Sequence, residues 1–218
     1  MLAVQLLTGM PVTVHAADAP PFNYKGTLEN CHEAVCVSGS HLEGTPTHLT
    51  WQEVTIAYKA RATVVKADLA EGTITGNDSR NSNWVMTGRV QIFMPQGHLS
   101  ADRATMQIVN DRITILTSQG APASFERDAD GAAAPNSAAQ AALEHAQGHA
   151  REIVFDVDRN ELELKGEAYV TAGCYEFSSD HMVYDIGTQR IQADPRDNSS
   201  VSGVFHKSAG CGQGGDKS

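Results

Sequence analysis

The chain has few aromatic residues and few charged ones, and basic side chains are in the minority. Of its 218 residues, 6% are aromatic and 19% charged, with 16 Lys and Arg against 26 Asp and Glu. A net charge of −10 argues against nucleic acid as a partner, because phosphate binding needs clustered basic side chains. The scarcity of aromatics, together with much Gly, Thr, Ser, Val and Ala, favours strands and turns over long helices.

The N-terminus lacks both charge and a long hydrophobic run. No charged residue precedes Asp18, and the apolar run of about a dozen residues is too short to span a bilayer. It ends in Val14-His15-Ala16, a small-x-small pattern that is typical of signal-peptide cleavage. We expect residues 1–16 to be an export signal; the alternative is a membrane anchor.

Cysteine is scarce as well, with four residues in the chain. An even number in an exported protein permits disulfides. We expect Cys31 and Cys36 to form a local bridge, while Cys174 pairs with Cys211 or Cys211 stays free or links chains. Because no second Cys/His pair at zinc-ligand spacing follows the first two cysteines, we expect no metal site and no cofactor.

From Thr47 onward, apolar and polar residues alternate with period two, as they do in half-buried strands. The alternation is clearest in THLTWQEVTIAYKARATVVKA, NWVMTGRVQIFM, HLSADRATMQIVNDRITILTS, AREIVFDVDRNELELKGEAYVTA and YEFSSDHMVYDIGTQRIQA. Turn-forming residues such as Gly, Asn-Asp and Asp-Arg-Asn separate these runs. We expect an all-β domain over residues 47–206, preceded by a polar lead over 17–46 and followed by a disordered tail over 207–218.

One Ala-rich segment interrupts the strands. Residues 127–148 contain no β-branched residue, so we expect a mobile insertion there, with an amphipathic helical pattern over residues 136–147. His145 and His149 have the spacing of metal ligands on a helix. Gly148 lies between them and would break the helix, which favours two unrelated histidines in a loop.

The chain also repeats a pattern, since residues 88–113 align with residues 166–191 without a gap. Apolar residues recur at the same positions of both copies: Val90/Ala168, Ile92/Val170, Leu99/Phe177, Ala104/Met182 and Met106/Tyr184. Their spacing of two within each strand places them on one face. The repeat therefore predicts short strands that each contribute an apolar face to a common interior.

These repeats resemble the OstA-like family of lipopolysaccharide-transport proteins, and most closely its periplasmic bridge component. The similar segments cover about residues 85–193, and the most specific are Gly-x-Pro-Ala-x-Phe at 120–125 and Gly-His-Ala at 148–150. The stretch 52–83 and the Cys-containing lead depart from the family pattern. The resemblance implies an open, twisted antiparallel β-jellyroll of consecutive short strands with an apolar interior. It further implies a protein that carries lipopolysaccharide through the periplasm between the inner and outer membranes.

The resemblance and the repeat together name candidate lipid-binding residues. By match to the family's ligand-facing positions, Leu49, Phe125, Phe155 and Val157 should line the interior. The repeat register adds Ile92, Phe177 and Tyr184. The alternative for each of these residues is a place in a packed core that contacts no ligand.

The implied partners are lipopolysaccharide, inner-membrane and outer-membrane transport components with the same fold, and further copies of the chain joined head to tail. Open sheet edges invite added strands. The first and last candidate edges, residues 46–56 and 199–207, carry little charge.

Three other functions remain open: a membrane-anchored inner-membrane component of the same pathway, a structural β module without lipid, and an enzyme. The sequence contains no Gly-x-Ser-x-Gly, His-Glu-x-x-His or phosphate-loop motif. The Ser, Asp and His of residues 178–181 are neighbours on one strand and point to opposite faces, so they cannot form a triad. We therefore expect no catalytic residues.

Overall fold

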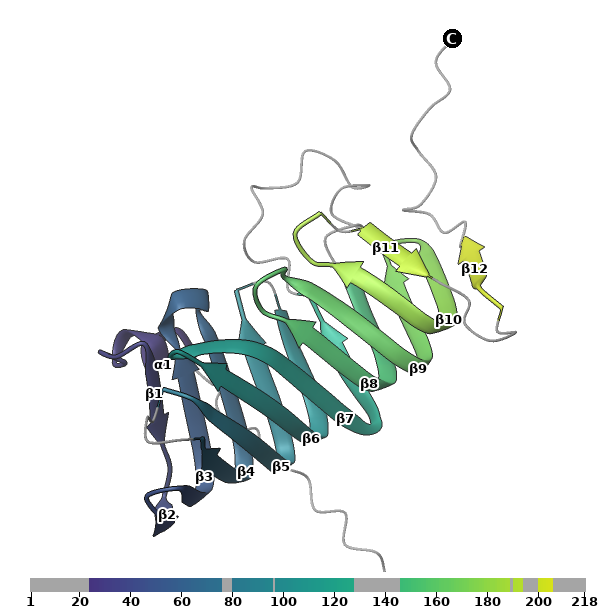
Figure 1. Cartoon of the computed structure of the whole chain (residues 1–218). Coiled ribbons are helices and arrows are strands. Elements are labelled where there is room, and N and C mark those ends of the chain that lie inside the picture. Colours follow the sequence, from purple (N-terminus) through teal and green to yellow (C-terminus); the bar gives the residue numbers. More distant parts are fainter. Residues whose placement is uncertain are drawn as a thin grey trace, which may run out of the picture.

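The computed structural model describes residues 24–75, 80–95, 97–127, 146–188, 190–193 and 200–205. Within these ranges the chain forms one short α-helix, one 3-10 turn and twelve strands that belong to a single sheet (Figure 1). The elements are α1 (Tyr24–Glu29), β1 (Val35–Ser38), β2 (His41–Thr45), β3 (His48–Tyr58), η1 (Lys59–Arg61), β4 (Thr63–Ile74), β5 (Ser82–Met94), β6 (Gly97–Val109), β7 (Arg112–Glu126), β8 (Ala146–Asp156), β9 (Glu161–Ala172), β10 (Tyr175–Asp185), β11 (Arg190–Ala193) and β12 (Ser202–Phe205). The prediction of an all-β, open antiparallel jellyroll is confirmed.

The long strands β3 to β10 pair in sequence order, each antiparallel to the next (Figure 1). Apolar and polar residues alternate along these strands, so that one face of each strand is buried. In β9, Leu162 and Leu164 are buried, while the adjacent Glu161 and Glu163 are partly exposed. Among the described residues, no helix has the length and apolar character needed to cross a membrane.

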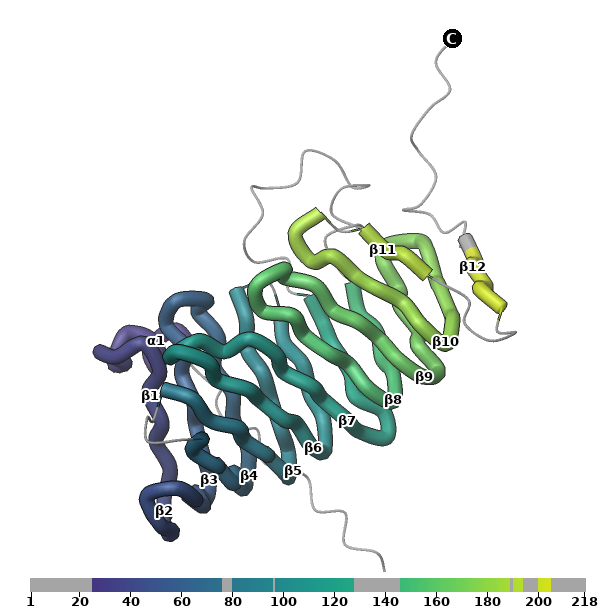
Figure 2. Tube along the Cα trace, in the orientation of Figure 1, coloured from purple at the N-terminus to yellow at the C-terminus, as the bar shows by residue number. Residues whose placement is uncertain are grey.

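A crease divides each long strand into two halves. Pairing is interrupted or shifted at the same level from β3 to β10, so the interruptions line up across the sheet. In Figure 2 the two halves of the long strands lie one in front of the other and meet along the lower side. We call the two halves the first wall, whose short edge strands are β2 and β11, and the second wall, whose edge strands are β1 and β12.

The repeated sequence encodes the crease. Gly88 and Gly166 begin the two copies and have φ of +73° and +74°, and the residues after them, Arg89 and Glu167, have φ of +45° and +53°. Two successive residues in the left-handed region kink a strand, and glycine adopts that region without steric cost. The kink in β5 lies beside Asp68 of β4, which forms an ion pair with Arg89 at 2.7 Å.

The first end of the sheet differs from the expected edge, whereas the expected last edge, residues 199–207, contains the edge strand β12. We expected residues 46–56 to form the first edge, but β3 is covered by β1 along one half and by β2 along the other. At the far end, β10 is covered in the same way by β11 and β12. The expectation for the first edge was wrong because a strand can join a sheet by backbone hydrogen bonds alone, without an apolar face. The polar segment 35–45 pairs with β3 in this way.

Element boundaries also differ from those expected. The sheet begins at Val35, inside the segment 17–46 that the sequence indicated as a polar lead. Strand β8 begins at Ala146, so the last three residues of the expected insertion 127–148 are strand, as is His149. Pairing of these small residues with both β7 and β9 overrides their low strand propensity.

Several sequence-based expectations fall on residues outside the described part of the chain. These are the signal peptide over 1–16, the helical pattern over 136–145 with His145, the tail over 207–218 and Cys211.

Helix α1 packs on the outside of the second wall. Ala57 of β3 and Val64 of β4 alternate with inward residues and face outward, yet they are buried with Cys31 in a small second cluster. Cys31 is joined to Cys36 of β1 by a disulfide with a Cα–Cα distance of 5.7 Å. The expected local bridge therefore links the helix segment to the edge strand.

Candidate functional site

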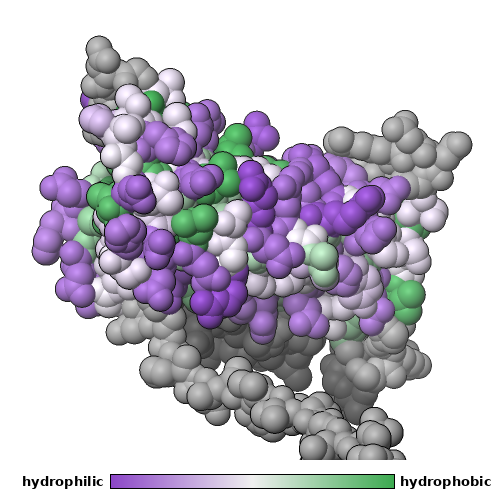
Figure 3. Space-filling view, turned by 90° about the horizontal axis from the view of Figure 1, so that it is seen from below, coloured by the Kyte–Doolittle hydropathy of each residue, from purple (hydrophilic) through white to green (hydrophobic). Residues whose placement is uncertain are grey.

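The space between the two walls is one continuous hydrophobic cluster. Its buried members come from every long strand, β3 to β10, and partly buried side chains of β1 and β11 extend it to both ends. Figure 3 shows the molecule from below, where hydrophilic residues predominate over hydrophobic ones on the described surface. The fold thus separates a polar exterior from an apolar interior that runs the length of the sheet.

The structure places all seven candidate lipid-binding residues in this cluster. Buried members are Ile92, Phe125, Phe155, Val157 and Tyr184. Leu49 of β3 and Phe177 of β10 are partly buried against it, near its two ends. Their contact with a lipid stays a prediction.

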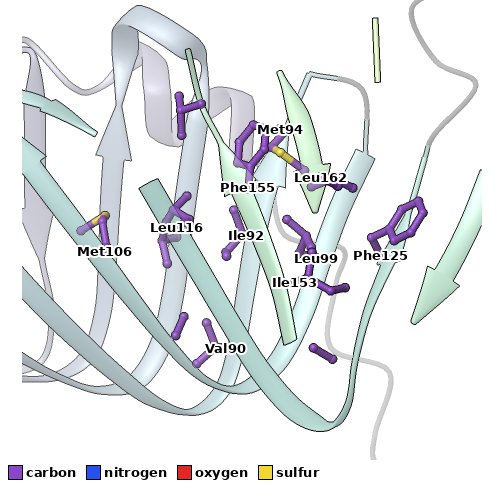
Figure 4. Packing of buried hydrophobic residues seen from close by; sticks show 14 of the residues in the cluster. Val90, Ile92, Met94, Leu99, Met106, Leu116, Phe125, Ile153, Phe155 and Leu162 are labelled. Atoms are coloured by element: carbon purple, nitrogen blue, oxygen red, sulfur yellow. The ribbon is translucent and has the colours of Figure 1, made fainter. Parts of the chain in front are cut away.

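The walls face each other with an offset along the chain. In Figure 4, Met94 of the second wall lies beside Phe155 and Leu162, which belong to β8 and β9 of the first wall. Likewise the ring of Phe125 in β7 stacks on that of Tyr184 in β10, with centroids 5.6 Å apart. At these two places, a strand of the second wall therefore packs against strands of the first wall that come about three places later.

Sequence reasoning named only part of the interior. Equally buried residues that it did not name as candidates include Met86, Leu116, Ile153, Leu162, Leu164 and Met182. The same alternation that identified Phe155 also marks these positions as inward, so the period-two pattern was the available signal.

The interior is filled by its own side chains. Ile92, Leu99, Leu116 and Ile153 have relative exposures of 0–1%, as residues of a close-packed core do. No space for a ligand is left beside these residues while the two walls pack against each other. Further contacts join the rims of the two walls.

Charged and polar side chains link the rims near the N-terminal end. Arg61 follows β3 on the rim of the second wall. Arg112 begins β7 and Asp158 lies in the turn between β8 and β9, both on the rim of the first wall. The Oδ1 atom of Asp158 accepts hydrogen bonds from Arg112 at 2.7 Å and from Arg61 at 3.4 Å. A hydrogen bond to Tyr58 of β3, followed by attraction to Asp158, raises the pKa of Arg112.

Toward the C-terminal end the rims meet at Tyr184. Burial raises the pKa of the Tyr184 hydroxyl, and the nearby Arg127 of the second wall partly opposes this. The ring of Phe125, two residues before Arg127 in the chain, stacks on the ring of Tyr184. Tyr184 therefore has an aromatic neighbour for its ring and a cationic neighbour for its hydroxyl, both from the second wall.

A polar network lies on the outer side of the first wall. The Nε2 atom of His181 is 2.8 Å from Oε1 of Glu163, and Lys165 is 3.1 Å from the other oxygen of that carboxylate. Ser179 Oγ accepts a hydrogen bond from the backbone of His181, while the side chain of Asp180 is exposed. The imidazole of His181 thus has Glu163 of the neighbouring strand β9 as a hydrogen-bond partner.

No group of three or more His, Cys, Asp or Glu side chains within the described ranges has a geometry that could hold a metal ion. The site that the geometry defines is the interior cluster of hydrophobic side chains.

Comparison with known proteins supports the resemblance seen in the repeats. A crystal structure of LptH, the LptA-homologous periplasmic component of the lipopolysaccharide-transport device of Pseudomonas aeruginosa, is similar with a TM-score of 0.51 and 20% sequence identity. The alignment covers 66% of this chain and 94% of LptH, and at this identity it shows a common fold. No curated protein matches the sequence.

A family model matches residues 66–190, which is more than half of the chain and contains most of the interior-facing positions. The model describes lipopolysaccharide-transport proteins comprising LptA and the N-terminal domain of LptD. With the folded sheet and its apolar interior, this match confirms the resemblance to the OstA-like proteins and to LptA in particular: the chain belongs to the LptA/LptD N-terminal-domain family of lipopolysaccharide-transport proteins.

Proposed function

We propose that the protein binds lipopolysaccharide by its acyl chains and passes it through the periplasm as one segment of a β-jellyroll bridge between the inner and outer membranes. The observation that carries this proposal is the apolar interior, which continues without a break from β1 to β11. Transport of this kind requires no catalytic residue and no cofactor. Membership of a transport family supports the proposal.

Acyl chains can replace the contacts that the walls now make with each other. Burial of each CH₂ group is worth about 0.8 kcal/mol, so roughly ten methylenes would contribute about 8 kcal/mol. This gain offsets the separation of side chains such as Leu99 and Ile153, because those side chains exchange one apolar neighbour for another. The polar headgroup would stay at the rims, in contact with water.

The bridge itself would form at the ends of the sheet. The short strands β1 and β2 at one end, and β11 and β12 at the other, each have a side that pairs with no described strand. A strand from another copy, or from a membrane component with the same fold, could extend the sheet there by β-augmentation. We propose head-to-tail association, which would join the interiors of successive copies.

Sedimentation of the mature protein over a wide concentration range tests the association. A head-to-tail contact does not close, so the average mass should rise steadily with concentration. A truncation that removes residues 199–218, and with them β12, should lower the average mass while lipid binding is kept. A closed dimer of fixed mass would contradict the proposal.

Adjacent residues of β7 provide a matched test of lipid binding. Leu116 points into the interior and has an exposure of 0%, whereas Thr117 points outward and is partly exposed. Leu116→Asp places a carboxylate against hydrocarbon, which costs several kcal/mol, and should abolish binding of purified lipopolysaccharide. Thr117→Asp adds the same group to the outer face and should bind as the wild type does.

Because Leu116→Asp could fail to fold, a second experiment probes the interior without a charge. A photo-crosslinking phenylalanine analogue in place of Phe155 should attach to bound lipopolysaccharide, since Phe155 lies inside. The same analogue in place of Ile115, which is 42% exposed, should not attach. Attachment at Ile115 alone would refute binding between the walls and would favour a purely structural β module.

A further inference from the structure

The contact of Arg61 and Arg112 with Asp158 lies where a lipid would enter the interior. Arg61 and Asp158 are 97 residues apart in the chain and belong to opposite walls, so their hydrogen bond joins the two rims. Arg112 donates to the same oxygen atom, Oδ1 of Asp158. Two guanidinium groups from opposite walls therefore converge on one anionic oxygen.

We propose that Arg61 and Arg112 form a binding site for the phosphate group of an acylated lipid, which replaces Asp158 as the anion that the two arginines share. This inference rests on the proposed function, because it assumes that acyl chains occupy the interior. It adds the chemical class of the headgroup and the two side chains that recognise it.

Three properties of the site support this assignment. The side chains of Arg61, Arg112 and Asp158 are 45%, 56% and 45% exposed, and ion pairs in contact with water are weak enough to exchange partners. Phosphate carries more charge than a carboxylate and offers three acceptor oxygens, which match the fork of donors on arginine. A phosphate between the two guanidinium groups would also keep the rims connected while the acyl chains below it separate the walls.

Position favours a lipid phosphate over one that is free in solution. An amphiphile whose chains lie between the walls must carry its headgroup at the rim, which places its phosphate beside these arginines. The chain has a net charge of −10, so a general attraction for anions is not expected. Two converging arginines at the rim therefore indicate local recognition.

The test compares two lipids that differ only in phosphate. Lysophosphatidate and monoacylglycerol with the same acyl chain are titrated, below their micelle concentrations, into the full-length protein by displacement of a fluorescent fatty acid. We expect the wild type to bind lysophosphatidate about ten-fold more tightly than monoacylglycerol, as charge-assisted hydrogen bonds provide. Arg61→Gln and Arg112→Gln should each reduce this ratio to about three or less, and Asp158→Asn, which removes the competing carboxylate, should raise it.

Arg159→Gln is the matched control. Arg159 lies in the same turn as Asp158, is 74% exposed and contacts Asp156 and Glu161 of its own wall, so its loss removes one positive charge without touching the link between the rims. This variant should keep the wild-type ratio. An equal fall of the ratio in Arg159→Gln would reduce the effect to overall charge and overturn the proposal.

Further outcomes separate the possible failures. A wild type that binds both lipids equally, or whose preference survives in both Arg61→Gln and Arg112→Gln, would overturn the phosphate site while leaving the proposed function intact. A wild type that binds neither lipid would overturn the proposed function itself. Excess inorganic phosphate should compete for the same two arginines and lower the preference while monoacylglycerol binding stays unchanged, and a preference that excess phosphate leaves intact would overturn the proposal.

Discussion

Replacement of Gly148 by alanine should destabilise the protein, because the space beside this residue is already occupied. A Cβ atom at Gly148 would lie 2.5 Å from Cε1 of Phe125 and 2.5 Å from the carbonyl oxygen of Tyr169. The Phe125 ring is held against Tyr184, and the Tyr169 carbonyl belongs to the backbone of β9, which pairs with β8. Neither neighbour can move away without disturbing the interior or the sheet.

The size of the effect follows from these distances. Ordinary contact begins at 3.4 Å, so both neighbours must retreat by about 0.9 Å. Overpacking of this kind costs about 1–3 kcal/mol, which for a chain of this length lowers the melting temperature by about 3–10 °C. Urea unfolding followed by tryptophan fluorescence, together with calorimetry, measures both quantities.

Gly203 of β12 provides the control, because its Cβ atom would have no heavy atom nearer than 3.7 Å. Gly203→Ala should change the free energy of unfolding by no more than about 0.5–1 kcal/mol, in the stabilising direction. If Gly148→Ala unfolds at the same urea concentration as the wild type, the close approach of β7, β8 and β9 at this position is refuted.

Other regions of the molecule give predictions that are independent of lipid. Gly166→Ala should cost about 1–2 kcal/mol of unfolding free energy, because φ of +74° strains any residue with a Cβ atom; equal urea midpoints would contradict this. Peptide mapping without reduction should recover Cys31 bonded to Cys36, and the double alanine variant should lose about 2 kcal/mol, whereas free thiols in native material would exclude the bridge. Burial raises the pKa of Glu163, but the hydrogen bonds from His181 and Lys165 lower it by more, so the pKa lies below the ordinary value of 4.5. The carboxylate therefore adds stability above about pH 4.5 and loses it as the pH falls through the lowered pKa, and the difference between wild type and Glu163→Gln in urea unfolding should shrink in acid; a constant difference would disprove the coupling.

The alternation of residues was sufficient to predict the strands and their inward faces. Leu162 and Leu164 are buried and Glu163 is not, as period two requires, and each of the seven named candidates lies in or against the interior cluster. The edge strand β2 was missed for the opposite reason. Every residue of β2 is exposed, so no apolar face marks it in the sequence, and only backbone pairing with β3 makes it a strand.

The repeat was visible in the sequence, but its meaning was not. Its glycines at 88 and 166 indicated similar strands, and the structure shows that they mark kinks in the crease. A kink depends on backbone dihedral angles, and glycine permits several of these, so its identity alone does not specify which one is used. The alignment of kinks from strand to strand depends on register, which pairing between strands sets.

The sequence by itself determined the all-β class and the residues that face inward, because these follow from a local pattern that repeats every two residues. The family was indicated by the resemblance of its motifs to those of the OstA-like proteins. Only the tertiary structure decided which residues meet across the interior. Contacts such as that of Phe125 with Tyr184, or of Arg61 with Asp158, depend on how the crease folds one wall over the other and on an offset of several strands. That offset accumulates from the twist and register of every intervening strand pair, and no short stretch of sequence contains it.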